Sequence, residues 1–148
     1  MKLSTLCYIE KDGKWLMLHR TKKNVDPNKG KWIGVGGKIK PDESPDECLV
    51  REVKEETGLA LTRFVHRGIV TFVSDEWETE YMFLYTADGF SGELRDCDEG
   101  ELAWIPIETV PSLNLWEGDR AFLKKLVDGA PYFSMKLVYQ GDNLVSVL

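Results

Sequence analysis

Apolar stretches bounded by turn-forming residues predict a chain of many short strands with two main helices. Seven segments carry the strand pattern, with β-branched and aromatic residues between clusters of glycine, proline and aspartate. They cover residues 3–9, 15–19, 64–73, 80–87, 101–105, 132–140 and 143–148. The polar stretch 24–31 contains a proline and a glycine, so we expect a loop there that leads into residues 32–35.

The first helix has clear signals at both of its ends. Ser44 is a favoured N-cap residue, Pro45 suits the first helical position, and Glu47 stands three residues after the cap. Gly58 follows at the point where a left-handed residue would end the helix. We therefore predict a helix over Pro45–Thr57. A second helix is predicted over residues 119–128.

The two faces of the first helix differ in character. Its apolar stripe, which we expect to pack on the core, consists of Leu49, Val50 and Val53. The neighbouring face carries three carboxylates at i, i+3 and i+4, namely Glu52, Glu55 and Glu56. Like charges at these spacings cost about 0.2–0.5 kcal/mol per pair unless something neutralises them. A hard divalent cation such as Mg²⁺ would do so, and the alternative is a solvated acidic surface. The Gly36–Gly37 turn and Glu43, just before the cap, favour the metal.

The balance of strands and helices predicts an α/β fold with a mixed sheet packed between helices. A length of 148 residues suits a single domain over residues 1–148, and no repeat, low-complexity tract or linker interrupts it. The composition is that of an ordinary globular protein, with 43% hydrophobic and 30% charged residues.

Net charge and cysteine usage exclude several classes of protein. The net charge of −6 argues against a surface that coats a nucleic acid polymer. Cys7, Cys48 and Cys97 are widely spaced, which is typical of reduced thiols rather than of a disulfide framework or a zinc site. We expect no signal peptide, and no apolar run approaches the roughly 20 residues that cross a bilayer. We expect a cytoplasmic protein, monomeric or homodimeric, with no membrane partner.

Residues 37–59 resemble the signature of the Nudix hydrolases. The nine residues that match it at the required spacing are Gly37, Glu43, Arg51, Glu52, Val53, Glu55, Glu56, Gly58 and Leu59. The resemblance implies an α/β/α sandwich with a mixed sheet, and an enzyme that hydrolyses a nucleoside diphosphate linked to another group. It also implies Mg²⁺, with Mn²⁺ as an alternative, because such cations neutralise phosphate oxygens and lower the pKa of bound water.

The same resemblance implies a role for each polar residue of the segment. The direct metal ligands would be three carboxylates and one backbone carbonyl, those of Glu52, Glu55, Glu56 and Gly36. Glu52, or as a second choice Glu56, would also take the proton from the attacking water. Glu43 and Arg51 would orient the ligating glutamates. For Arg51, the alternative is an ordinary surface ion pair.

Three further places are candidates for contacts with substrate or metal. Arg20 and Lys23 end the second expected strand and suit a phosphate group, although a solvated basic turn is the alternative. Glu99 lies in an acidic loop and would, by the resemblance, be an extra metal ligand; otherwise it is simply solvated. Trp116 could stack on a purine whose edge Asp119 binds, and the alternative is that Trp116 belongs to the core.

The segments around the signature resemble the MutT-type diphosphatases, which release the monophosphate and pyrophosphate from oxidised purine nucleoside triphosphates such as 8-oxo-dGTP. The base pocket that this implies is lined by Trp32, Phe72, Trp116 and Asp119. Ile33 is a departure, because animal enzymes of this type have an asparagine there. Two alternatives stay open. One is a pyrophosphatase for ADP-ribose or a dinucleoside polyphosphate, and the other is a non-catalytic nucleotide-binding module, against which the intact glutamates argue.

Overall fold

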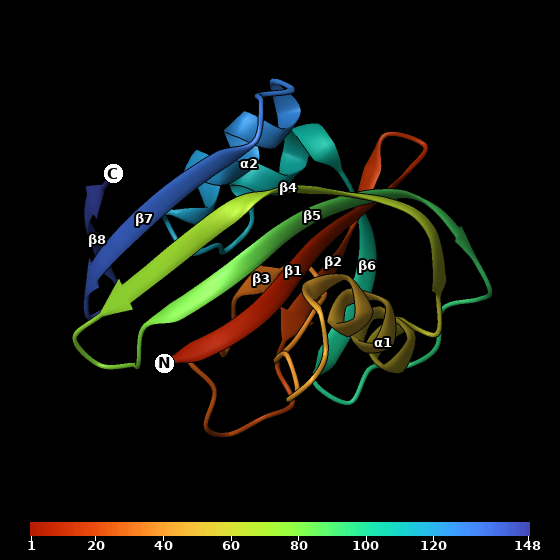
Figure 1. The fold of residues 1–148 in the computed structure, drawn as a ribbon, viewed down its shortest axis with the longest axis horizontal. Helices are drawn as coiled ribbons and strands as arrows, with labels where there is room; N and C mark the ends of the chain where they lie inside the picture. The colour runs from red at the N-terminus through yellow and green to blue at the C-terminus, as the bar shows by residue number, and fades with distance from the viewer.

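A mixed sheet of eight strands forms the middle layer of the fold (Figure 1). The computed structural model describes all of residues 1–148. The strands are β1 (Lys2–Lys11), β2 (Lys14–Arg20), β3 (Trp32–Ile33), β4 (Ala60–Ser74), β5 (Glu80–Ser91), β6 (Gly100–Pro106), β7 (Phe133–Gln140) and β8 (Asn143–Val147). They lie in the order β3-β2-β1-β5-β4-β7-β8, and β6 pairs with β2. β1 is parallel to β5 and β4 is parallel to β7, whereas the other pairs are antiparallel.

Two α-helices cover opposite faces of this sheet. The helical elements are α1 (Pro45–Thr57), the 3₁₀ helix η1 (Ile107–Ser112) and α2 (Asp119–Val127). Tyr8 of β1 belongs to the same core as Phe122 of α2, whereas its neighbour Ile9 belongs to the core that contains Leu49 of α1. Successive side chains of a strand point to opposite faces, so the two helices lie on either side of the sheet. The expected α/β/α sandwich is confirmed. Neither helix is long and apolar enough to span a membrane.

The expected elements are present, but some of their ends differ. β4 begins at Ala60, four residues before the expected start, and its pairing with β5 is irregular near Arg63 and again between His66 and Gly68. Such bulges break the two-residue alternation by which a strand is recognised in a sequence. η1 was not expected, because its six residues include Pro111 and are too few to show a helical period.

The apolar stripe of α1 is narrower than expected. Leu49 and Val53 are fully buried, but Val50 is 38% exposed, so its assignment to the core was wrong. Each helical residue advances by about 100°, which carries Val50 away from the line through Leu49 and Val53. Cys48 and Thr57 are buried instead. The remaining surface of α1 is left to its charged residues.

The segment between β3 and α1 lies along β1. Isolated bridges join Ser4 to Lys38 and Cys7 to Val35, and the backbone N–H of Thr5 donates to the Gly37 carbonyl at 2.8 Å. These bonds fix the glycine turn against β1, next to the helix that carries the acidic face. All three cysteines are buried and unpaired.

Candidate active site

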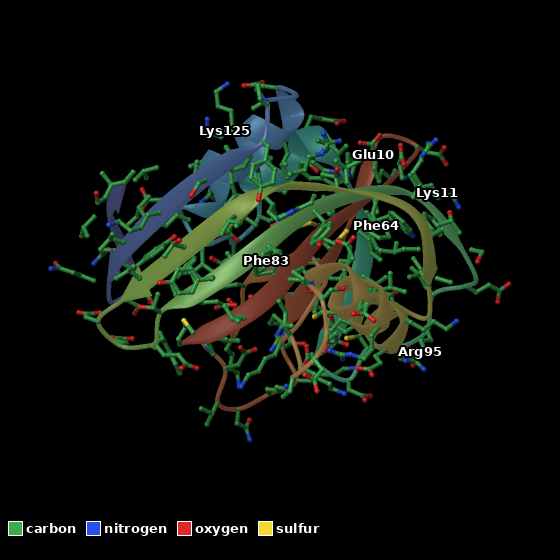
Figure 2. All side chains as sticks on the ribbon, in the orientation of Figure 1. Glu10, Lys11, Phe64, Phe83, Arg95 and Lys125 are labelled. Carbon is green, nitrogen blue, oxygen red and sulfur yellow. The ribbon has the colours of Figure 1, made fainter.

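α1 is capped at both ends, which fixes the direction in which its acidic face points. Ser44 Oγ accepts a hydrogen bond from the Glu47 N–H, and the Glu47 carboxylate accepts one from the Ser44 N–H, at 3.1 and 2.9 Å. Gly58 has φ of 83°, the left-handed conformation that favours glycine. Arg95 lies beside the end of α1 (Figure 2) and donates to backbone carbonyls of its last turn. The predicted helix is confirmed at both ends.

Arg51 is the centre of an ion-pair network on this face. Its guanidinium binds both oxygens of Glu43, at 2.6 and 2.8 Å. A terminal nitrogen also contacts Glu52 at 2.8 Å and Glu55 at 3.3 Å. The hydrogen bond from Arg51 is the main reason why the pKa of Glu43 is lowered to about 2. The network therefore orients three carboxylates around one planar cation.

Gly36 and Gly37 bring the backbone into contact with the carboxylates of α1. The Gly36 N–H donates to Glu56 Oε1 at 2.8 Å. A Cβ on Gly37 would lie 2.4–2.7 Å from the carboxylate atoms of Glu52, and one on Gly36 would collide with the Thr5 carbonyl. At Gly36, where the collision is with backbone, only glycine permits this approach. The Gly36 carbonyl accepts no hydrogen bond from the protein.

Glu56 has a buried carboxyl group, one oxygen of which lacks a donor. The residue is 7% exposed, and its Oε2 has no hydrogen-bonding partner when the carboxyl is ionised. The group faces Glu99, in the loop before β6, closely enough for the two carboxyls to share a proton. Burial raises the pKa of Glu56 to about 9, and the Glu99 carboxyl and the charge of Glu52 add to the effect.

Glu99 is the ionised member of this pair. Burial opposes its charge, but hydrogen bonds from Lys23 and Glu56 and the charge of Arg20 hold its pKa below the usual value. Lys23 Nζ lies 2.8 Å and Arg20 2.5 Å from the Glu99 oxygens. Arg20 also pairs with Asp26 at 2.8 Å. The two predicted phosphate-binding cations therefore neutralise Glu99 in this structure.

These groups fit a divalent cation. The partnerless oxygen of Glu56, the facing carboxylate of Glu99 and the Gly36 carbonyl are hard oxygen donors of the kind that Mg²⁺ prefers. No three acidic side chains are gathered closely enough to enclose an ion as they stand. Glu52 and Glu55 are instead held by Arg51. Direct ligation by these two residues stays a prediction.

A cavity opens beside the glycine turn, and its lining is mixed in character. The residues that line it include the apolar Leu6, Ile33, Phe72, Met82 and Trp116, the polar Asn28, Glu80 and Asp119, and Gly36 and Gly37. Because the two glycines also contact Glu56 and Glu52, the cavity and the acidic face of α1 meet at the same turn.

The aromatic walls of the cavity are held in place by the protein itself. Trp116 is 6% exposed, and its indole N–H donates to Asn28 Oδ1 at 2.8 Å. The Phe72 ring meets it edge-on at 5.9 Å between centroids and stacks on Tyr139 at 4.8 Å. Lys31 Nζ lies over the Trp116 ring, 5.0 Å from its centroid. These contacts fix the positions of the aromatic rings that line the cavity.

Asp119 adds an unpaired carboxyl to this wall. The residue is 3% exposed, and its side chain accepts no hydrogen bond and forms no ion pair within the protein. Burial raises the pKa of Asp119 to about 8, although Arg120 and Lys31 oppose the shift. The carboxyl is therefore mostly neutral at pH 7, and a neutral carboxyl both donates and accepts hydrogen bonds.

Residues 2–126 match the family model described as the NUDIX domain. The chain belongs to the Nudix family. It is 30% identical over 119 residues to the oxidized purine nucleoside triphosphate hydrolase of Danio rerio, covering 80% of this chain and 74% of that one. It is 49% identical over 107 residues to the ADP-ribose pyrophosphatase of Methanocaldococcus jannaschii, covering 71% and 62%. The crystal structure of a Mutator MutT protein from Bacillus halodurans has a TM-score of 0.89 and 25% identity, covering 100% and 97%.

The protein is thus a Nudix hydrolase, and its structure gathers most of the expected base-pocket residues in one place. Phe72, Trp116 and Asp119 line the same cavity, as does Ile33. Trp32 is not among the residues that line it. Its ring stacks on that of His19, with 4.5 Å between centroids and 4° between planes. A contact between Trp32 and the base stays a prediction.

Five polar residues of the Nudix cavity were not predicted from the sequence, namely Lys2, Ser4, Thr5, Asn28 and Glu80. Glu80 has a signal that could have revealed it, because it stands two residues before Met82 on β5 and thus shares its face. Asn28 has no comparable signal. It lies in the loop before β3, and its side chain reaches the cavity only through the conformation of that loop.

Proposed function

We propose that this Nudix hydrolase is a cytoplasmic, Mg²⁺-dependent pyrophosphohydrolase that cleaves oxidised purine nucleoside triphosphates, such as 8-oxo-dGTP, to the monophosphate and pyrophosphate. The observation that carries the proposal is the buried, unpaired carboxyl of Asp119 in a cavity with aromatic walls. Purine edges present both donors and acceptors, which a neutral carboxyl can bind together. The name of the Danio rerio relative is consistent with this substrate class.

The position of the cavity supports a substrate that is both a base and a phosphate chain. Gly36 and Gly37 line the cavity, while Glu56 and Glu52 contact the same glycines. A nucleotide whose base fills the cavity would therefore have its phosphates within reach of the acidic face. The basic residues beside Glu99, which are Arg20 and Lys23, would contribute positive charge there.

The residues of α1 would then divide the chemistry between them. Mg²⁺ supplies the positive charge that neutralises phosphate oxygens and lowers the pKa of water. The groups that would hold it are Glu52, Glu55, Glu56, Glu99 and the Gly36 carbonyl. Glu52, or as a second choice Glu56, would take the proton from the water that attacks phosphorus. Glu43 and Arg51 would keep these glutamates oriented through the network described above.

A second candidate substrate is ADP-ribose, because the relative from Methanocaldococcus jannaschii carries that activity in its name. This alternative keeps the same acidic face and changes only the occupant of the cavity. A dinucleoside polyphosphate is a further alternative of this kind, with the same acidic face and a different occupant of the cavity. A module that binds nucleotide without cleaving it is disfavoured by the intact set of glutamates.

A hydrolysis screen tests the proposal. The purified protein is incubated with 8-oxo-dGTP, the four normal dNTPs, ADP-ribose and diadenosine polyphosphates at matched concentrations and millimolar Mg²⁺, and each product is identified by chromatography. We expect the highest kcat/KM for 8-oxo-dGTP, with pyrophosphate as the product. Cleavage of ADP-ribose or of diadenosine polyphosphates with all triphosphates inert would refute the proposal, and no cleavage of any nucleotide would favour the binding module.

A further inference from the structure

The amide of Asn28 has only one orientation that its surroundings allow. The Trp116 indole nitrogen lies 2.8 Å from Asn28 Oδ1. An indole N–H can only donate, so the amide atom that faces it must be the oxygen. The residue is further fixed by its backbone, because its N–H donates to Asp26 Oδ1 at 3.0 Å and its carbonyl accepts from the Lys31 N–H at 2.8 Å.

This orientation leaves the amide nitrogen of Asn28 unused. The nitrogen carries two N–H donors, and neither makes a hydrogen bond within the protein. The side chain lines the cavity that contains Phe72, Trp116 and Asp119, and also a second hollow that continues it toward Trp77. Asn28 thus lines both parts of the extended cavity, and the N–H donors of its amide have no acceptor within the protein.

Apart from the carboxyl of Asp119, the other side-chain donors that line the cavity already have partners within the protein. Ser4 Oγ donates to Glu80 at 2.6 Å, Thr5 Oγ1 lies 3.4 Å from the Gly37 carbonyl, and Lys2 Nζ lies 3.8 Å from Glu80 Oε2. Ile33, at the position where the animal enzymes carry an asparagine, has no hydrogen-bonding side chain. Glu80 can only accept when ionised, and one of its oxygens already accepts from Ser4 Oγ at 2.6 Å. Of the amide side chains, Asn28 is the one in the cavity.

We propose that Asn28 is a specificity-determining residue, whose amide nitrogen donates a hydrogen bond to an exocyclic oxygen of the purine, O6 or O8. The inference rests on the proposed function, and it assigns to Asn28 the polar role that Ile33 cannot perform. An exocyclic oxygen accepts hydrogen bonds. Adenine carries an amino group in place of O6, and the N–H donors of that group would face the N–H donors of Asn28. A site built to bind one group rejects an analogue that leaves its polar atoms unpaired.

Two variants test the donors of Asn28. Asn28→Asp removes both donors and keeps an oxygen that accepts from Trp116, so it separates the donors from the anchoring role. Asn28→Leu removes the donors and this acceptor without adding charge, so it controls for the charge of the aspartate. Asn24→Asp, which introduces the same charge at an exposed position of the same loop with no side-chain hydrogen bond, is the matched control. Thermal unfolding of each variant checks that the fold is retained.

The readout is kcat/KM for four substrates that combine the two oxygens: 8-oxo-dGTP carries O6 and O8, dGTP only O6, 8-oxo-dATP only O8, and dATP neither. We expect both Asn28 variants to lower kcat/KM for 8-oxo-dGTP at least tenfold more than for dATP, while Asn24→Asp changes no ratio more than twofold. The oxygen that is bound is identified by the substrate with the larger loss of kcat/KM: a larger loss for dGTP indicates O6, and a larger loss for 8-oxo-dATP indicates O8.

Equal losses for all four substrates, or no loss, would overturn the role of Asn28 while leaving the proposed function intact. The wild-type protein distinguishes the two claims. If it cleaves no purine nucleoside triphosphate, the proposed function fails, and the inference that rests on it fails with it.

Discussion

The carboxyl of Glu56, on α1, faces the carboxyl of Glu99, which the loop before β6 brings to it from a distant part of the chain. Two carboxyls that face each other closely share a proton, and both ionise only when a cation lies between them. One oxygen of Glu56 has no other partner. We therefore expect a metal ion that binds between the two carboxyls to displace the proton that they share.

The first prediction concerns Glu56→Gln. We expect turnover to fall by about 10²–10⁴-fold, because the variant loses a metal ligand and a candidate base. Without metal, the melting temperature should be unchanged or higher, since the glutamine amide can donate to Glu99 and still accept from the Gly36 N–H. Steady-state kinetics and thermal unfolding in EDTA provide the measurements. Glu101→Gln, at an exposed position of β6, is the control. Retained turnover with a lower melting temperature would contradict the metal assignment.

Mg²⁺ itself should stabilise the protein. A ligand that binds only the folded state adds RT ln(1 + [L]/Kd), which is about 2.7 kcal/mol at 100 times Kd. The Glu56→Gln variant should show a smaller increase in melting temperature than the wild type, because the neutral amide is a poorer ligand for a hard cation. Differential scanning calorimetry with and without Mg²⁺ measures both. If Mg²⁺ raises the melting temperatures of the wild type and of Glu56→Gln equally, the cation does not bind at Glu56.

Arg51→Lys should weaken the site without unfolding the protein. A lysine cannot bind both oxygens of Glu43 while also contacting Glu52, so the glutamates lose their common anchor. Removal of such orienting partners typically costs about 10–100-fold in metal affinity or activity. We expect the Mg²⁺ concentration for half-maximal activity to rise, measured by titrating Mg²⁺ at fixed substrate.

The chain offers a matched control for this substitution. Arg63 makes a similar two-oxygen contact with Asp88, at 2.6 and 3.0 Å, but on the exposed part of β4. Arg63→Lys should therefore leave the Mg²⁺ dependence unchanged. If the two variants behave alike, Arg51 has only the role of a surface ion pair.

The contrast between α1 and the cavity explains how much the sequence alone can predict. The acidic face was predictable because its geometry is local: caps fix the ends of the helix, and a spacing of three or four residues fixes which carboxylates are neighbours. The cavity depends on contacts between distant segments. On β3, for example, the ring of Trp32 stacks on His19 and packs on the same core as Phe72 and Trp116, yet Trp32 does not line the cavity. Its neighbour Ile33 does line the cavity, although its side chain packs with the core on the other face of the sheet. Neither the sequence pattern nor the resemblance distinguishes between these two neighbours.

The last prediction is that Asp119 makes the stability depend on pH. Its folded pKa is raised to about 8 by burial, whereas an aspartate in an unfolded chain has a pKa of about 3.9. Between these values the folded protein holds a proton that the unfolded chain has lost. The free energy of unfolding should therefore decrease as pH rises through this window, by at most about 1.4 kcal/mol per pH unit, and level off above the folded pKa. Lys31 and Arg120 favour the ionised form and reduce the effect, while Glu80 reinforces it.

The isosteric variant Asp119→Asn isolates this contribution, because it has the same shape and does not titrate. Urea unfolding of both proteins in EDTA from pH 5 to 9 gives the difference in their unfolding free energies, in which the titration of the Glu56–Glu99 pair cancels. We expect the wild type to lose stability relative to the variant as pH rises to about 8, in line with the raised pKa of Asp119. Asp142→Asn, in the exposed turn between β7 and β8, should give a flat difference. A flat difference for Asp119→Asn as well would mean that Asp119 is ionised in the folded protein, and the base pocket would then offer only acceptors at this wall.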